Sequence, residues 1–142
     1  RRNVFDARMP KRMVSVGGLC RELEAVSDYL YFFAVWEADY PEICEMFDRF
    51  GREHAENMKR LEKDLIKLGR EYLGDVKAKI VNAPDKNICS VIRYCEKKEK
   101  EDRLLYERLY LIDEADLFKY SLKEILRASK ERLSILENIQ KT

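Results

Sequence analysis

The sequence predicts an all-α fold, a single antiparallel four-helix bundle, and three observations support this prediction. Charged residues make up 39% of the 142 residues and hydrophobic ones 46%, a balance typical of amphipathic helices. Only five glycines and three prolines are present, so the residues that tight turns require are scarce. Four segments carry apolar residues at helical spacing, which indicates one buried face on each. We predict a basic tail over residues 1–13 and the bundle over residues 14–142.

The first two predicted helices form a hairpin. We expect the first over residues 14–38 and the second over residues 41–68. Pro41 suits the first turn of the second helix, because a helix start leaves that N–H unpaired. Gly69 suits its end. The break at residues 39–40 is so short that the two helices must be antiparallel neighbours.

The third and fourth predicted helices form a second hairpin. They span residues 87–111 and 114–139, with a tight link at Asp113. The connection between the hairpins, residues 69–86, contains a short stretch at residues 79–82 that we expect to be extended. About 18 residues reach up to ~60 Å, whereas a 25-residue helix is only ~37 Å long. A long crossover can therefore start the third helix parallel to the second.

The charge of the chain argues against large anionic partners. The net charge is +1, which provides no global field to attract nucleic acid or anionic lipid. The first twelve residues are an exception, because five cations against Asp6 give +4 there. We interpret this segment as a solvated terminus, with phosphate contact as the alternative.

The remaining composition suggests a cytoplasmic protein. No apolar run approaches the ~20 residues of a membrane span, and the N-terminus shows no apolar signal region. The cysteines lack metal-binding spacing, so we expect reduced thiols in or near the core; they are Cys20, Cys44, Cys89 and Cys95. The abundance of Lys and Glu resembles that of proteins from hot environments.

Polar residues interrupt the apolar seam at the middle of each helix. They are Glu22, then Gly51 and His54, then Glu99 and Asp102, and finally Ser129 and Arg132. The two halves match: Tyr29 follows Glu22 by seven residues and Tyr106 follows Glu99 by seven, and Glu22 to His54 is 32 residues while Glu99 to Arg132 is 33. The pattern indicates an internal duplication of a helical hairpin.

These residues resemble the ferritin-like superfamily, and rubrerythrin-type domains most closely. The stretch Arg21–Ala34 is similar to that family's first helix, and Gly51–Ala55 is similar to its E-x-x-H helix with the Glu replaced. The resemblance covers about residues 14–140. It implies a four-helix bundle in which two helical hairpins, joined by a long crossover loop, hold two iron or manganese ions. Each hairpin of the family gives one Glu from its first helix and an E-x-x-H pair from its second.

Three of the six expected ligands are present. Glu22 and Glu99 match the lone carboxylates and His54 matches one histidine, while Asp102 would supply a further carboxylate. Gly51 and Ser129 stand where the family has its bridging Glu, and Arg132 stands where it has the second His. Two close cations need bridging anions, and a guanidinium 5 Å from a divalent ion would repel it by about 6–7 kcal/mol at an effective dielectric of 20. The substitutions therefore disfavour a working di-iron centre.

We expect instead a buried cluster in which Arg132 binds one or both of the carboxylates of Glu22 and Glu99. Gly51 and Ser129 would make room for Arg132 and for the two seam tyrosines, Tyr29 and Tyr106. This interpretation predicts a non-catalytic bundle without a cofactor, and the resemblance implies a homodimer.

The alternative is a residual iron or manganese site with a redox or oxidative-stress role, held by Glu22, His54 and Glu99 and extended by Asp102. Each residue also has a simpler interpretation. His54 would be a hydrogen-bonded core histidine, Glu99 and Asp102 would belong to a solvated charged face, and Arg132 would extend to solvent.

Overall fold

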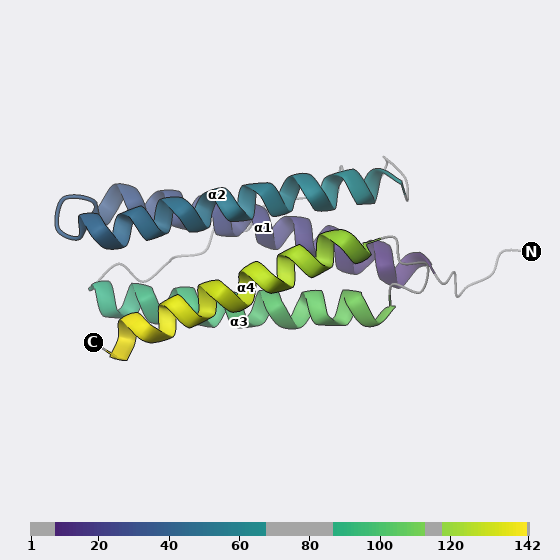
Figure 1. Ribbon diagram of the computed structural model, residues 1–142. Coiled ribbons are helices and arrows are strands. Elements are labelled where there is room, and N and C mark those ends of the chain that lie inside the picture. Colours follow the sequence, from purple (N-terminus) through teal and green to yellow (C-terminus); the bar gives the residue numbers. More distant parts are fainter. Residues whose placement is uncertain (1–7, 68–86, 113–117, 142) are drawn as a thin grey trace, which may run out of the picture.

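The computed structural model describes residues 8–67, 87–112 and 118–141, with side chains from residue 16 onward. Within these ranges the chain forms four helices and no strand. They are α1 (Arg8–Trp36), α2 (Pro41–Ile66), α3 (Ile88–Ile112) and α4 (Lys119–Lys141), shown in Figure 1. The predicted all-α class is confirmed.

The four helices form a bundle of two antiparallel hairpins (Figure 1). Helix α1 pairs with α2 and α3 pairs with α4, and the hairpins meet where α1 packs on α3 and α2 packs on α4. Because α2 ends at the end of the bundle opposite to the start of α3, these two helices run parallel, as predicted for a long connection. The connection itself, including residues 79–82, lies outside the described residues.

The predicted boundaries differ from the structure mainly at the starts of the first and fourth helices. Helix α4 begins at Lys119, and the predicted start at residue 114 and tight link at Asp113 lie outside the described residues.

Helix α1 begins at Arg8, inside the predicted tail, because positive charges do not prevent helix formation and Pro10 falls in the first turn, where proline is tolerated. Helix α2 begins at Pro41 as predicted. The turn before it closes through the Tyr40 N–H, which donates to the Trp36 carbonyl at 2.9 Å.

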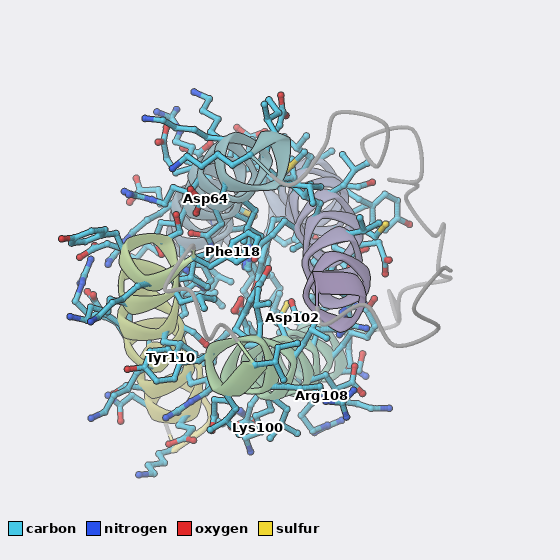
Figure 2. All side chains as sticks on the ribbon, turned by 90° about the vertical axis from the view of Figure 1, so that its right-hand side faces the viewer. Asp64, Lys100, Asp102, Arg108, Tyr110 and Phe118 are labelled. Atoms are coloured by element: carbon cyan, nitrogen blue, oxygen red, sulfur yellow. The ribbon has the colours of Figure 1, made fainter. Side chains whose placement is uncertain are left out.

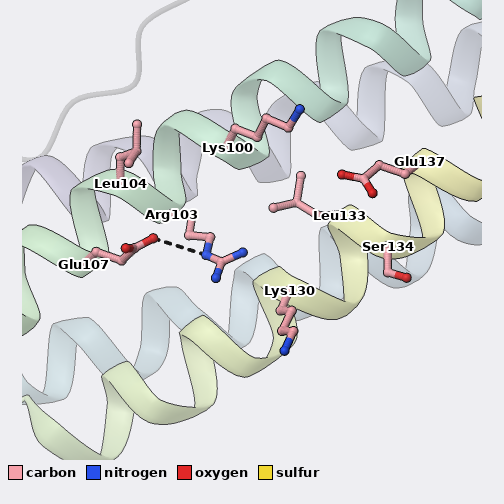
Figure 3. A pocket seen from close by; sticks show the side chains of 8 residues that line it. All are labelled: Lys100, Arg103, Leu104, Glu107, Lys130, Leu133, Ser134 and Glu137. Carbon is pink, nitrogen blue, oxygen red and sulfur yellow. Dashed lines mark ion pairs between the residues drawn. The ribbon is translucent and has the colours of Figure 1, made fainter.

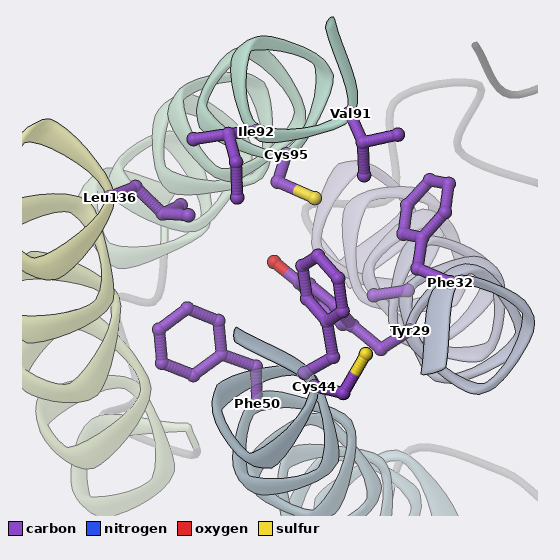
Figure 4. Packing of buried hydrophobic residues seen from close by; sticks show 10 residues of the cluster. Tyr29, Phe32, Cys44, Phe50, Val91, Ile92, Cys95 and Leu136 are labelled. Carbon is purple, nitrogen blue, oxygen red and sulfur yellow. The ribbon is translucent and has the colours of Figure 1, made fainter. Parts of the chain in front are cut away.

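The apolar core is divided into two clusters by a polar layer. Figure 4 shows the cluster nearer the α1–α2 turn, in which side chains of all four helices meet. Its buried members are Ala25, Tyr29, Phe32, Cys44, Phe47, Phe50, Val91, Ile92, Cys95 and Leu136. Toward the other end lie Leu19, Leu61, Leu65, Tyr106, Leu109, Phe118, Leu122 and Ile125. Each fully buried large side chain stabilises the fold by roughly 1.5–3 kcal/mol, so the layer lies between two substantial apolar blocks.

The direction in which each side chain points follows the helical period. In Figure 2, Asp102 points into the bundle, whereas Lys100 and Arg108 on the same helix point outward. Cys44 and Cys95 are buried as expected, but Cys89 is exposed in the first turn of α3, so the prediction of a core position was wrong for this thiol. None of the described helices is apolar over a sufficient length to cross a bilayer.

Candidate functional site

One ionisable side chain from each helix reaches the centre of the bundle. Glu22 on α1, His54 on α2, Glu99 on α3 and Arg132 on α4 are each at most 2% exposed. All four occupy the seven-residue rows that also carry the buried apolar side chains, so the helical period turns them inward. We call these four residues, together with their hydrogen-bond partners, the central network.

His54 bridges the two central carboxylates. Its Nδ1 lies 2.5 Å from Glu22 Oε2 and its Nε2 lies 2.5 Å from Glu99 Oε1. An imidazole donates from both nitrogens only when it is protonated. Burial alone would lower the pKa of His54, but Glu22 and Glu99 outweigh burial and raise this pKa to about 10. His54 is therefore a cation at neutral pH.

Glu22 receives two further hydrogen bonds. The Tyr106 hydroxyl donates to Oε1 at 2.5 Å, and the Asn57 amide lies 3.3 Å from Oε1 and 3.4 Å from Oε2. The hydroxyl also lies 3.2 Å from the Gly18 carbonyl, and a Cβ at Gly18 would come within 3.1 Å of the Tyr106 ring. The missing side chain at Gly18 thus allows Tyr106 to reach Glu22.

Glu99 is held by Arg132 on its other side. The Arg132 Nε lies 2.9 Å from both carboxylate oxygens. Burial alone would raise the pKa of Glu99, but the cations His54 and Arg132 outweigh it and lower this pKa to about 2. The Arg132 Nη1 donates at 2.9 Å to Glu53, whose side chain is 28% exposed. The central network therefore reaches the surface at Glu53.

The charges of the buried layer balance. Glu22 and Glu99 are opposed by the protonated His54 and by Arg132, each at hydrogen-bonding distance. Burying ions is expensive, and attraction offsets that cost only where the geometry is good and the other hydrogen-bonding positions are filled. Tyr106 and Asn57 fill those positions on Glu22.

Asp102 belongs to a separate pair. Its Oδ1 accepts from Arg21 Nε at 2.5 Å, and Arg21 also contacts Glu101 at 3.0 Å. Burial raises the pKa of Asp102 to about 7 in spite of this cation. The structure therefore pairs Asp102 with Arg21, whereas the resemblance implies a further metal-ligating carboxylate at this position.

The predicted small residues have different neighbours. Tyr29 stacks on His54 with ring centroids 5.6 Å apart, and a Cβ at Gly51 would lie 3.4 Å from Tyr29 Cβ, which is ordinary contact. A Cβ would therefore be tolerated at Gly51, so the expected space-making role falls to Gly18, which makes room for Tyr106. Ser129 is buried, and its hydroxyl finds no hydrogen-bond partner among the described residues.

Sequence reasoning missed Gly18, Asn57 and Glu53. Asn57 follows His54 by three residues and Glu53 precedes it by one, so their helical positions suggested proximity to the layer. Gly18 lies four residues before Glu22, on the same face of α1. Only the relative rotation of α1 and α3 shows that Tyr106 passes over it.

These residues do not fit a dinuclear metal centre. Among the described side chains, no group of three or more His, Cys, Asp and Glu is arranged to hold a metal ion. The two nitrogens of His54 face different carboxylates, so the imidazole separates Glu22 from Glu99 and does not converge with them. Gly51 and Ser129 carry no carboxylate to bridge two cations.

A hollow of about 520 Å³ lies at the surface between α3 and α4 (Figure 3). Arg103 and Glu107 form an ion pair at 3.2 Å across its wall. Its charged residues are three cations and two carboxylates, so their field largely cancels; the lining consists of Lys100, Arg103, Leu104, Glu107, Lys130, Leu133, Ser134 and Glu137. This hollow has no strong preference for a charged ligand.

Comparison with known proteins provides no relative for this chain. No family model, no curated protein and no solved structure matches it. We therefore infer function from the geometry of the central network.

Proposed function

We propose that this chain is a ferritin-like bundle in which two protein cations, His54 and Arg132, have replaced a dinuclear metal centre, and that it acts as a non-catalytic scaffold or binding module. The observation that carries the proposal is the double engagement of His54, with one carboxylate on each ring nitrogen at 2.5 Å. The helix order and the long connection between the hairpins support the ferritin-like assignment.

The network is suited to holding helices together. Glu22 and His54 join α1 to α2, His54 and Glu99 join α2 to α3, and Glu99 and Arg132 join α3 to α4. In a dinuclear site, metal ions neutralise the buried carboxylates. Here the same neutralisation comes from side chains, so the bundle needs no ion to balance its interior charge.

The cavity that the structure shows beside the central network leaves little space for chemistry. The cavity beside Glu99 and Asp102 measures about 10 Å³, which is at the lower limit for one water molecule. A substrate needs a pocket of roughly 300 Å³ or more. This observation favours a structural role over a catalytic one.

Elemental analysis tests the loss of the metal site. Protein produced with iron and manganese available should contain neither metal above background. The variant Gly51→Glu, Ser129→Glu and Arg132→His restores the family's ligand types and serves as the matched positive control, provided that it remains folded. Stoichiometric iron or manganese in the unaltered protein would contradict the proposal and favour the residual site of Glu22, His54 and Glu99.

Substitution of Arg132 tests the ionic replacement. Arg132→Met should lower the free energy of unfolding by about 3–5 kcal/mol, because Glu99 loses one of its two cations inside the bundle. Arg127→Met on the same helix is the control, since Arg127 is exposed and pairs only at the surface, where such pairs contribute about 0–1 kcal/mol. Urea denaturation measures both.

A double variant separates charge from packing. Adding Glu99→Gln to Arg132→Met removes the negative charge left in excess, so that Glu22 and His54 balance, and it should recover more than about 1 kcal/mol. If Arg132→Met costs no more than Arg127→Met, or if Glu99→Gln adds a further loss, the cations do not have the proposed role.

A further inference from the structure

Helices α2 and α4 diverge toward the end of the bundle that holds the α1–α2 turn. Figures 1 and 2 both show the C-terminal half of α4 leaning away from α2. Among the described residues, the ion pair between these helices that lies nearest to this end joins Arg49 to Glu131 at 2.8 Å. Beyond this ion pair, the corner of the bundle between α2 and α4 is open.

A surface groove of about 530 Å³ lies in this open corner. Its apolar walls are half-buried and pack on the apolar cluster of Figure 4; they are Ile43 and Met46 of α2 and Ile135 and Ile139 of α4. From Glu131 to Ile139 is eight residues, so the groove is about 12 Å long. A helix laid in it presents about two turns, which is the spacing of the apolar anchors in helix-in-groove recognition.

The uncompensated charges of the groove are negative. Glu42 and Glu45 line it and are exposed, and neither forms an ion pair with a described residue. Arg49 also lines the groove, but two carboxylates already pair with it. The segment 37–47, which leads into this corner, contains four carboxylates and no cation. The groove therefore favours a cationic ligand, unlike the hollow between α3 and α4, whose charges largely cancel.

We propose that this groove binds a basic amphipathic helix of a partner protein. The apolar stripe of that helix lies on Met46 and Ile139, and its Lys or Arg side chains lie beside Glu42 and Glu45. Apolar contact supplies the affinity, while the carboxylates select the sign of the charge. The proposal names a partner class for the binding module proposed above. It concerns a surface apart from the central network, so it can fail while the network keeps its role.

The basic segment at the start of this chain does not reach the groove. Residues 1–7 precede Arg8, where α1 begins, whereas α2 begins with Pro41 at the opposite end of the bundle. Helix α1 has 29 residues and separates the two ends by about 43 Å. Seven residues extend over at most ~25 Å, so this segment is not the occupant within one molecule.

Two synthetic peptides test the choice of ligand. Both carry leucines at helical spacing i, i+3, i+4 and i+7, with lysines at the other positions in one and glutamates in the other. In fluorescence anisotropy, the lysine peptide should bind the unaltered protein with a Kd below about 100 µM, and the glutamate peptide at least about tenfold more weakly. Because the net charge is +1, long-range attraction would favour the glutamate peptide, so this preference reports the local charge of the groove.

Neutral polar substitutions test the apolar walls. Met46→Asn on α2 and Ile139→Asn on α4 should each weaken binding of the lysine peptide at least about fivefold, because each removes apolar contact area. The matched control is Leu104→Asn on α3, in the wall of the other hollow, where the leucine is 67% exposed. This control should leave binding unchanged. Circular dichroism verifies the fold, and the two groove variants lie on different helices, so either one suffices.

Neutralisation of the carboxylates tests the charge selection. Glu42→Gln combined with Glu45→Gln should abolish the preference for the lysine peptide. The matched control neutralises Glu56 and Glu62, which are exposed farther along the same helix. It gives the same net charge and should keep the preference. Equal loss of the preference in both double variants would show that the peptides respond to net charge, which contradicts the proposal.

Other results overturn the proposal directly. They are a lysine peptide that does not bind at roughly 100 µM, one that binds no better than the glutamate peptide, and an equal loss of binding in Leu104→Asn. Sedimentation and urea denaturation of Met46→Asn without peptide cover the remaining occupants. Self-association that disappears in Met46→Asn would assign the groove to a second copy. A large loss of stability, with no peptide binding by the unaltered protein, would assign it to another segment of this chain.

Discussion

Gly18 shows how one missing side chain controls the layer. A Cβ at this position would lie 3.1 Å from the ring of Tyr106 and 3.6 Å from its hydroxyl, whereas a Cβ at Gly17 would meet nothing within 4 Å. The hydroxyl is the group that donates to Glu22. An added methyl group would therefore disturb Tyr106 at Gly18 and nothing at Gly17, although the two glycines are adjacent in the sequence.

This difference yields a prediction for the pair. Gly17→Ala should stabilise the protein by up to about 1 kcal/mol, because alanine is the better helix former. Gly18→Ala should lose that gain and lower the free energy of unfolding, since Tyr106 must move away from Glu22. Urea denaturation of both variants provides the measurement, and equal stabilisation of the two would contradict the role given to Gly18.

At the scale of a helix, α4 carries two buried serines with opposite surroundings. Ser121 donates to Asp64 of α2 at 2.5 Å, so it joins the two hairpins beyond the central network. The Ser129 hydroxyl has no hydrogen-bond partner among the described residues. A buried hydroxyl without a partner destabilises a fold, whereas one that serves a buried carboxylate stabilises it.

We therefore expect opposite effects of alanine at these positions. Ser121→Ala should destabilise the protein by about 1–3 kcal/mol because Asp64 loses its buried donor. Ser129→Ala should be neutral or slightly stabilising. Thermal unfolding measures both, and a large loss for Ser129→Ala would show that its hydroxyl has a partner after all.

The helices show what could be predicted from the sequence and what could not. The seven-residue rows identified which residues share a face, because the helical period depends on the backbone alone; Glu22, His54, Glu99 and Arg132 lie together inside the bundle. Which of them pair depends on how each helix is rotated about its axis and shifted along it relative to its neighbours. The seven-residue rows give no information on either. Arg132 was expected to bind one or both of Glu22 and Glu99, and it binds Glu99 together with the unpredicted Glu53. His54 lies between the two carboxylates, which the rows did not indicate.

Residues outside the rows were missed for the same reason. Asp102 pairs with Arg21, which lies on the half-exposed side of α1 and was absent from the predicted cluster. Asn57 and Gly18 act through contacts between helices, and a polar or small residue near a seam gives no sign of its partner. The sequence thus indicated that a polar layer is present, whereas the hydrogen bonds and ion pairs within it are visible only in the three-dimensional structure.

For the whole molecule, the central network makes the free energy of unfolding fall as the pH becomes alkaline. The pKa of His54 is raised from 6.5 to about 10. A raised pKa means that the folded state holds the proton more tightly, so the stabilisation is complete below pH 6.5 and is lost as the pH rises through 10. A shift of this size corresponds to stabilisation on the order of 5 kcal/mol.

We predict that the free energy of unfolding falls between pH 7 and pH 10. His54→Gln should be less stable at pH 6 and should lose most of this slope, because glutamine does not titrate. Denaturation series at pH 6, 8 and 10 check the comparison. An unaltered protein with equal stability at all three values would show that His54 does not carry the extra proton.

At low pH, Glu99 gives the opposite pH dependence, so that its contribution to stability is lost as the pH falls. The pKa of Glu99 is lowered from 4.5 to about 2, so its contribution is present above pH 4.5 and disappears as the pH falls through 2. The network as a whole therefore favours the folded state most strongly in the mildly acidic to neutral range.

The placement of the charged side chains also affects how the two hairpins dock during folding. The first hairpin contains its own opposite charges in Glu22 and His54, and the second contains Glu99 and Arg132, so each half is neutral at this level before the halves meet. Leucines and phenylalanines would tolerate docking one helical turn out of step, about 5.4 Å. In that misaligned form, Glu99 would lose contact with His54 and face apolar side chains, at a cost of several kcal/mol. The polar layer therefore fixes the register of the two hairpins, because the aligned docking is far more favourable than one shifted by a helical turn.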